Sequence, residues 1–335
     1  MTTRSSRRRF MLATLGAPAL ASLGLPLAAF AQTRPRHETV RILCGYPAGG
    51  SVDVISRRLA ERLTGSYGKV VIVENHPGAA GRLAVETLKA APADGSVLLL
   101  TPASVVTMYA HIYKQLSYDV FNDLEPVAIV AQTAFTFAVG PTVPPGVRTL
   151  ADFSGWCRAN AASASCGNAG AGSLPHFMAL LLARETGLEL NHVPYRGGQQ
   201  AMLAVVGGQV ASAIATESTS LALVQSGRLR ALATTGPERS AFLPDVPTFS
   251  EQGYKALTQR EWFGTFMPKR TPATEVNAAA QALEEILKQP DIQGAWGKLA
   301  LGAESSSPAQ LRRAIRTECD FWEPIVRARG FTPES

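Results

Sequence analysis

Short apolar runs that favour strands alternate along the chain with segments of helical periodicity. The first runs cover residues 40–46, 70–73 and 97–100, and amphipathic segments at 54–63 and 83–89 separate them. This alternation is typical of βαβ units built on a mostly parallel sheet. We therefore expect this part of the chain to form an α/β lobe.

The same alternation returns in the second half of the chain. Strand-like runs cover residues 188–193, 210–214 and 229–233, with helices expected near 199–206 and 221–225. Because the whole chain has 335 residues, more than one compact core is expected. The pattern predicts a second α/β lobe.

A long β-rich segment, residues 127–139, lies between the two predicted lobes. It runs into a cluster of residues that favour turns, which we interpret as a hinge beside a crossing strand. The cluster contains Pro141, Pro144, Pro145 and Gly146.

A return crossing is expected at residues 262–267, another β-rich run. Helices near 276–287 and 308–329 follow it and would pack against the first lobe. The predicted boundaries are residues 38–138 with 256–335 for the first lobe, and 139–255 for the second.

The first 31 residues have the features of a secretory signal peptide. Four arginines precede an acid-free apolar run over residues 10–30, which ends in Ala29-Phe30-Ala31. We expect cleavage after Ala31 and a mature protein in the periplasm. The order Ser6-Arg7-Arg8-Arg9-Phe10-Met11-Leu12 resembles a twin-arginine signal, and the general secretory route stays open as the alternative.

The charge balance excludes one class of partner. The chain has 32 basic and 26 acidic residues, and the predicted signal peptide holds four of the arginines and no acid. The remainder is nearly neutral and has no basic stripe with interleaved aromatic residues, so nucleic acid is not expected as a partner. Hydrophobic residues make up 46% of the chain, which is typical of a globular protein.

The four cysteines form no CxxC pair and no Cys/His pattern of zinc type, so no metal and no cofactor is expected. Export permits a disulfide, and Cys157 and Cys166 are the only two close in sequence. Closeness in sequence does not ensure bridging geometry, so that pairing stays open. Cys44 lies inside an apolar strand, where a core position is expected.

A glycine-rich turn at residues 46–53 joins the first strand to the first helix. Backbone N–H groups of such a turn, together with the helix dipole, favour a bound anion. An ordinary strand-to-helix connection is the alternative interpretation. The residues of interest here are Tyr46, Ala48, Gly49, Gly50, Ser51 and Asp53.

A comparable turn in the second lobe, residues 166–176, leads into a helix that begins near Pro175. Its GxxGxG spacing is neither a dinucleotide fingerprint nor a phosphate loop, and the chain has no GxSxG elbow. Two such turns, one per lobe, could hold a small anion between them. A third strand end carries Tyr195 and Arg196, and the arginine is suited to pairing with a carboxylate.

Several segments resemble the tripartite tricarboxylate transporter receptor family, also called Bug proteins. They are YPAGGSVDVISRRLAERL, VVIVENHPGAAG, CGNAGAGSLPHF, HVPYRGGQQAM, GGQV, GRLRALATTGPERS and LPDVPTFSEQGY. The resemblance covers nearly the whole chain after the signal peptide. It implies a type II periplasmic-binding fold, in which two α/β lobes joined by crossing strands close on a ligand in the cleft between them.

The resemblance also implies a monomer that binds a mono-, di- or tricarboxylate and delivers it to an inner-membrane permease or presents it to a sensor. By position, the first-lobe ligands would be the six residues of the first turn with Thr101 and Ser104. The second lobe would contribute Gly167, Asn168, Ala169, Gly172, Ser173, His176, Tyr195 and Arg196.

The sequence departs from the family pattern where an acid usually follows the GGQV strand. Ala211 and Ala215 stand there, with Glu217 nearby. The resemblance therefore favours a plain organic acid over an amino acid. Two other functions stay open at this point: an exported enzyme, which the twin-arginine-like signal motivates, and a scaffold without a ligand.

Overall fold

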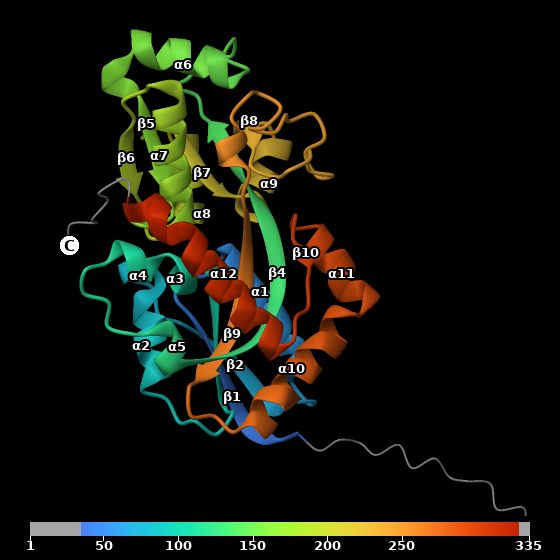
Figure 1. Ribbon diagram of the computed structural model, residues 1–335. Helices are drawn as coiled ribbons and strands as arrows, with labels where there is room; N and C mark the ends of the chain where they lie inside the picture. Colours follow the sequence, from blue (N-terminus) through green and yellow to red (C-terminus); the bar gives the residue numbers. More distant parts are fainter. Residues whose placement is uncertain (1–34, 328–335) are drawn as a thin grey trace, which may run out of the picture. The chain divides into compact units, whose positions relative to one another are not determined.

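The structure of the protein is a computed structural model that describes residues 35–327 (Figure 1). The predicted signal peptide and its cleavage at Ala31 lie outside the described residues. Within residues 35–327 no helix has the length and apolar character needed to cross a bilayer.

Lobe 1 is built on a sheet with the strand order β2-β1-β3-β9-β4. Strands β2, β1 and β3 are parallel, whereas β9 runs antiparallel to β3 and β4. The strands are β1 (His37–Cys44), β2 (Gly68–Asn75), β3 (Val97–Pro102), β4 (Leu124–Val139), β9 (Arg260–Pro268) and the short β10 (Gly302–Ala303), which pairs with β4.

Helices cover both faces of this sheet. On one face α1, α10 and α11 share a buried cluster with the strands. On the other face α2 to α5 and the long α12 pack against a second cluster. Their bounds are α1 (Ser51–Leu63), α2 (Arg82–Lys89), α3 (Ala103–Thr107), α4 (Tyr109–Ile112), α5 (Val120–Asp123), α10 (Ala273–Leu287), α11 (Pro290–Gly297) and α12 (Pro308–Arg327).

Lobe 2 uses the second half of β4 as a strand of its own sheet, ordered β8-β4-β7-β5-β6. Parallel β5, β6 and β7 alternate with helices, as expected for βαβ units. The elements are α6 (Leu150–Ala159), β5 (Ser165–Asn168), α7 (Leu174–Thr186), β6 (Asn191–Pro194), α8 (Gly198–Val206), β7 (Ser212–Thr216), α9 (Glu217–Gln225) and β8 (Arg230–Thr234).

Strand β4 therefore passes from one lobe to the other without a break. It pairs with β9 as far as Ala134 and with β7 from Phe135 onward. The predicted hinge is misplaced, because Gly140 and the prolines after it lie beyond the lobe-2 end of β4. There the Arg230 guanidinium of β8 donates to the carbonyl oxygens of Val143, Pro144 and Val147.

The return crossing lies just before the expected segment. Residues 262–267 belong to β9 inside the lobe 1 sheet, and the chain crosses at Gln259 and Arg260. Thr235 ties the two crossings together, because its hydroxyl accepts from the Phe135 amide at 2.9 Å and donates to the Gln259 carbonyl at 2.6 Å. Its own amide donates to the Phe135 carbonyl.

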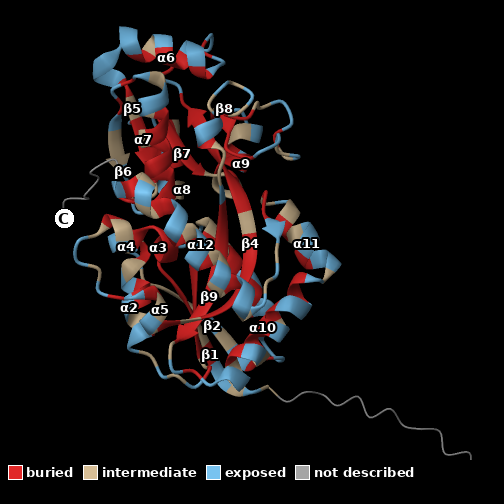
Figure 2. Ribbon diagram, viewed as in Figure 1, coloured by how far each residue is buried: buried red, intermediate tan, exposed pale blue. Residues whose placement is uncertain are grey.

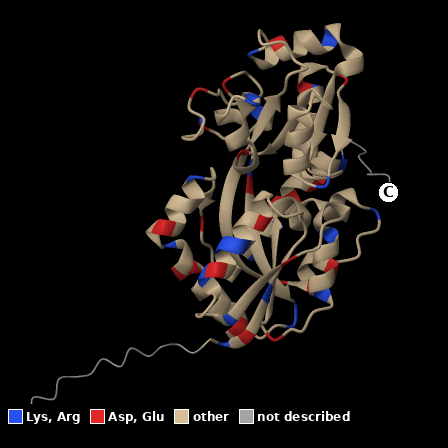
Figure 3. Cartoon of the chain, turned by 180° about the vertical axis from the view of Figure 1, so that it is seen from behind, with Lys and Arg blue, Asp and Glu red and all other residues tan. Residues whose placement is uncertain are grey.

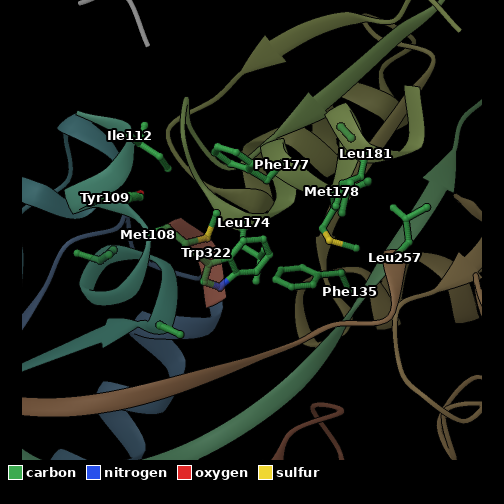
Figure 4. Packing of buried hydrophobic residues seen from close by; sticks show 14 of the residues in the cluster. Met108, Tyr109, Ile112, Phe135, Leu174, Phe177, Met178, Leu181, Leu257 and Trp322 are labelled. Atoms are coloured by element: carbon green, nitrogen blue, oxygen red, sulfur yellow. The ribbon is translucent and has the colours of Figure 1, made fainter. Parts of the chain in front are cut away.

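The largest apolar cluster extends across both lobes. Residues of α3, α4 and α12 in lobe 1 and of α7 in lobe 2 belong to it. Figure 4 labels some of its members, among them Tyr109 of α4, Phe177 of α7 and Trp322 of α12. Figure 2 places the buried residues along the shared strand β4 and the facing sides of the helices. The lobes are thus joined by packed side chains as well as by the two crossings.

The mixed α/β fold with two lobes confirms the prediction from the sequence pattern. The exact lobe boundaries, 38–138 with 256–335 and 139–255, stay a prediction. All four cysteines are buried free thiols, so Cys157 and Cys166 are not bonded to each other.

We predict that Thr235→Val destabilises the protein by about 1–3 kcal/mol, because the buried Phe135 amide and the partly buried Gln259 carbonyl would lose their hydrogen-bond partner. Thr235→Ser keeps the hydroxyl and should cost clearly less. Urea unfolding of both variants measures the difference. Equal stability of the valine and serine variants would show that this hydroxyl does not stabilise the crossing.

Candidate functional site

The β1–α1 turn is shaped by the buried carboxylate of Asp53. Its Oδ2 accepts from the Gly49 amide at 3.0 Å and from Arg57 Nε at 3.0 Å, and its Oδ1 accepts from Asn75 Nδ2 at 2.8 Å. Gly49 has φ +87°, a conformation that favours glycine. Asp53 is 2% exposed and does not line the cleft, so the structure gives it an organising position in the turn.

The pKa of Asp53 is lowered in spite of its burial. Burial alone acts to raise the pKa of this carboxyl, and the hydrogen bonds from Arg57, Gly49 and Asn75 more than offset it. The ionised carboxylate therefore holds the turn in one shape at neutral pH.

The three backbone amides that follow Gly49 in this turn are hydrogen-bond donors without an acceptor among the described residues. Gly50 is the N-cap of α1, and Ser51 and Val52 are its first residues. Their N–H groups have no hydrogen-bond acceptor among residues 35–327. Unpaired N–H groups at the start of a 13-residue helix attract an anion through hydrogen bonds and the helix dipole.

The β5–α7 turn in lobe 2 differs, because its glycine amides are already bonded. Gly170 donates to Asn168 Oδ1 and Gly172 donates to His176 Nδ1, both at 3.1 Å. Burial lowers the pKa of His176 to about 4, and His192 adds to the effect. A neutral ring whose Nδ1 carries no proton fits this acceptor role.

The two turns nevertheless face one shared cavity of about 270 Å³. Of the sixteen residues predicted for the site, half line it: Tyr46, Ala48, Gly50, Ser51, Ser104, Ala169, Ser173 and Arg196. The other half do not: Gly49, Asp53, Thr101, Gly167, Asn168, Gly172, His176 and Tyr195.

Most of the predicted residues that do not line the cavity pack behind the residues that do. Thr101 is buried in β3, and the Asn168 side chain is fully buried beneath the second turn. A Cβ added to Gly167 would lie 3.3 Å from the Tyr195 ring, and one added to Gly172 would lie 3.1 Å from the Tyr113 hydroxyl. These glycines allow close packing between neighbours.

A cluster of hydroxyl groups joins the lobes at one end of the cavity. Ser51 Oγ lies 2.6 Å from Thr216 Oγ1, 2.6 Å from Ser218 Oγ and 2.9 Å from Thr219 Oγ1. Ser51 begins α1 in lobe 1, and the other three lie at the start of α9 in lobe 2. This cluster is not visible in the sequence, because Ser and Thr residues some 165 positions away from Ser51 carry no signal of contact.

Glu261 is the second missed residue. It is 2% exposed, lines the cavity between the lobes, and accepts from the Ser104 amide at 3.2 Å. Burial raises its pKa to about 8, with Glu318 raising it further and the Ser104 hydrogen bond opposing the shift. An acid at the start of an otherwise apolar strand was the available signal.

A second, larger groove of about 1040 Å³ lies beside the cavity and shares Tyr46, Ala169 and Arg196 with it. Arg82, Lys114 and Arg196 line it, and no acid does. Arg82 also stacks over the Tyr113 ring at 3.8 Å. Elsewhere charges of both signs are interspersed over the two lobes (Figure 3).

Among residues 35–327 no group of three or more His, Cys, Asp or Glu side chains is placed to hold a metal ion. The site is instead formed by backbone amides, hydroxyls, one arginine and one buried acid, with apolar walls that include Phe135, Phe263 and Leu203. Such a lining suits a small organic anion with an apolar portion.

Comparison with known proteins agrees with this architecture. Among solved structures, the periplasmic binding protein BugD is 27% identical with a TM-score of 0.83, over 89% of this chain and 99% of that one. MatC from Rhodopseudomonas palustris, solved with bound malate, is 25% identical with a TM-score of 0.81, over 87% and 99%. These neighbours confirm the predicted periplasmic-binding-protein fold.

The sequence comparisons point to the same group of proteins. Protein BugT of Bordetella pertussis is 29% identical over 312 residues, which is 93% of this chain and 95% of that protein. The family model described as the tripartite tricarboxylate transporter family receptor matches residues 55–331. The chain therefore belongs to the tripartite tricarboxylate transporter receptor family.

Proposed function

We propose that the protein is a periplasmic receptor that captures a small organic carboxylate between its lobes and is not an enzyme. The observation that carries the proposal is the interlobe cavity into which the start of α1 faces with three unpaired backbone amides. Membership of a transporter receptor family and the malate bound by the similar MatC support a carboxylate as the ligand.

The two lobes would have unequal roles in binding. Lobe 1 offers the amides of Gly50, Ser51 and Val52 on a turn that Asp53 holds rigid. Lobe 2 offers the Arg196 guanidinium, which is suited to a second contact with a carboxylate. The two turns are therefore not equivalent as anion-binding groups, because the Gly170 and Gly172 amides already donate to Asn168 and His176.

Closure would be secured by the hydroxyl cluster around Ser51. This serine lines the cavity and contacts α9 across the lobes, so its position couples ligand contact to the approach of lobe 2. Opening would take place at β4 and at the segment before β9, where only two chain passages join the lobes. The closed form would then deliver the ligand to a membrane permease, with presentation to a sensor as the alternative.

A screen of the mature protein against acetate, malate, citrate and aspartate tests the proposal. A ligand at a hundred times its Kd stabilises the folded state by about 2.7 kcal/mol, which thermal unfolding detects. We expect a specific shift with at least one acid and no conversion of it. Deleting the gene should then abolish cellular uptake of that acid if the partner is a permease. Product formation, or no shift with any carboxylate, would contradict the receptor function.

We predict that Gly50→Val weakens binding of that acid at least about tenfold, or 1.4 kcal/mol, with the fold retained. Gly50 has φ −81°, and an added Cβ would have Pro47 O at 3.7 Å as its nearest neighbour, so the backbone accepts a side chain. The branched side chain would cover the amides. Isothermal titration calorimetry measures the loss.

Gly146→Val is the matched control, because a Cβ there meets nothing within 4 Å and the residue lies outside the cavity lining. It should bind as the wild type does. Gly172→Val is less suitable, since φ is +80° and the Tyr113 hydroxyl is close. Wild-type affinity in Gly50→Val would exclude the amides of this turn as the binding group.

A further inference from the structure

The cavity lining contains one acidic side chain, that of Glu261. Among the residues that the structure describes, Glu261 is the one acid and Arg196 the one base in the lining. Glu261 comes from β9 in lobe 1, next to the apolar side chain of Phe263, and is 2% exposed. Any ligand that fills about 270 Å³ must contact this carboxyl group or lie beside it.

The Glu261 carboxyl is held in place and has no cationic partner among the described residues. Its Oε1 accepts from the Ser104 amide at the start of α3, which fixes the side chain. The alternative is a purely structural role, in which Glu261 serves only as the N-terminal cap of this five-residue helix. A cap would not require a position in the ligand cavity, however, and solvated Asp or Ser serves that purpose at most helix starts.

The surrounding groups favour the neutral form of the acid. Glu318 of α12 is a half-buried acid whose charge acts to raise the pKa of Glu261, and burial raises its own pKa to about 6. Tyr46 of the β1–α1 turn is a half-buried phenol near Glu261, whereas Arg196, which lines the cavity from lobe 2, is a cation that would favour the ionised form. Burial raises the pKa of Glu261 to about 8, so at neutral pH the group carries its proton.

The ionised and neutral forms would act oppositely on the ligand. An ionised Glu261 would repel a carboxylate in the same small cavity and attract an ammonium group. A neutral Glu261 removes this repulsion and supplies an O–H donor, as carboxyl groups in apolar sites do.

Given the proposed receptor function, we propose that Glu261 binds the ligand as a neutral hydrogen-bond donor. The cavity would thereby select organic acids without an amino group, and binding of a fully ionised acid above the pKa of Glu261 would take up one proton. Glu261 would thereby discriminate between plain organic acids and amino acids. Ala211 and Ala215 cannot do so, because both lie outside the lining.

The test is the pH dependence of affinity, measured by calorimetry from about pH 6.5 to about pH 9.5. The probe is whichever of acetate, malate and citrate gives the largest thermal shift. The sign follows from the proposal: affinity is constant while Glu261 is neutral and falls about tenfold per pH unit above about pH 8. Titrations near pH 9 in two buffers of different ionisation enthalpy should show proton uptake approaching one per ligand.

Two variants separate this role from capping. Glu261→Gln is always neutral and can still accept from Ser104 and donate into the cavity, so its affinity near pH 6.5 should stay within about threefold of wild type and become independent of pH. Glu318→Gln, whose side chain does not line the cavity, should keep the pH dependence with its midpoint moved to lower pH.

Each other outcome overturns the inference in a distinguishable way. Strong binding without pH dependence in the wild type would mean that Glu261 does not touch the ligand, while the receptor function stands. Affinity that rises with pH, with aspartate preferred, would mean that an ionised Glu261 pairs with an ammonium group. Absence of binding by every acid at every pH would remove both the inference and the receptor function.

Discussion

The site depends on the hydrogen bonds that the buried carboxylate of Asp53 accepts. It accepts from Gly49, Arg57 and Asn75, and so joins the turn, the first helix and the end of β2. Because Gly49 donates to Asp53, the next three amides are left at the helix start with no partner among residues 35–327. In the proposed binding mode, a side chain outside the cavity lining thereby shapes the surface that would hold the ligand.

The second lobe is organised by the same principle with the opposite result. Asn168 and His176 take the glycine amides of the β5–α7 turn, which leaves a closed, self-bonded turn. Lobe 2 therefore contributes lining residues such as Ala169 and Ser173 to the cavity, together with Arg196. In the proposed receptor this asymmetry would place the anion on lobe 1 and let lobe 2 close over it, with Ser51 contacting residues at the start of α9.

Much of the fold was predictable because local periodicity reports burial directly. The runs at 40–46 and 54–63 became β1 and α1, and the later alternation became β6 to β8. The hinge was misplaced because prolines mark any turn, and this cluster ends β4 at the far side of lobe 2. The short helices α3 to α5 were missed because segments of four or five residues have no measurable period.

The site was predictable only in part, for a related reason. Glycine-rich turns before helices are visible in a sequence, so both loops were found. Whether an amide in such a turn is free depends on a side chain such as Asp53 or His176 that folds back onto it, and this is set by tertiary structure. The roles of Glu261 and of the Ser51 hydroxyl cluster depend on contacts between distant segments.

The most direct test of the account is a ¹H–¹⁵N NMR titration of the mature protein with the carboxylate that stabilises it most. The account predicts that the amide proton signals of Gly50, Ser51 and Val52 move furthest downfield, because their N–H groups gain a charged acceptor. The signals of Gly49 and Gly172, whose amides are already bonded to side chains, should move little. The reverse pattern would contradict the claim that the start of α1 binds the anion.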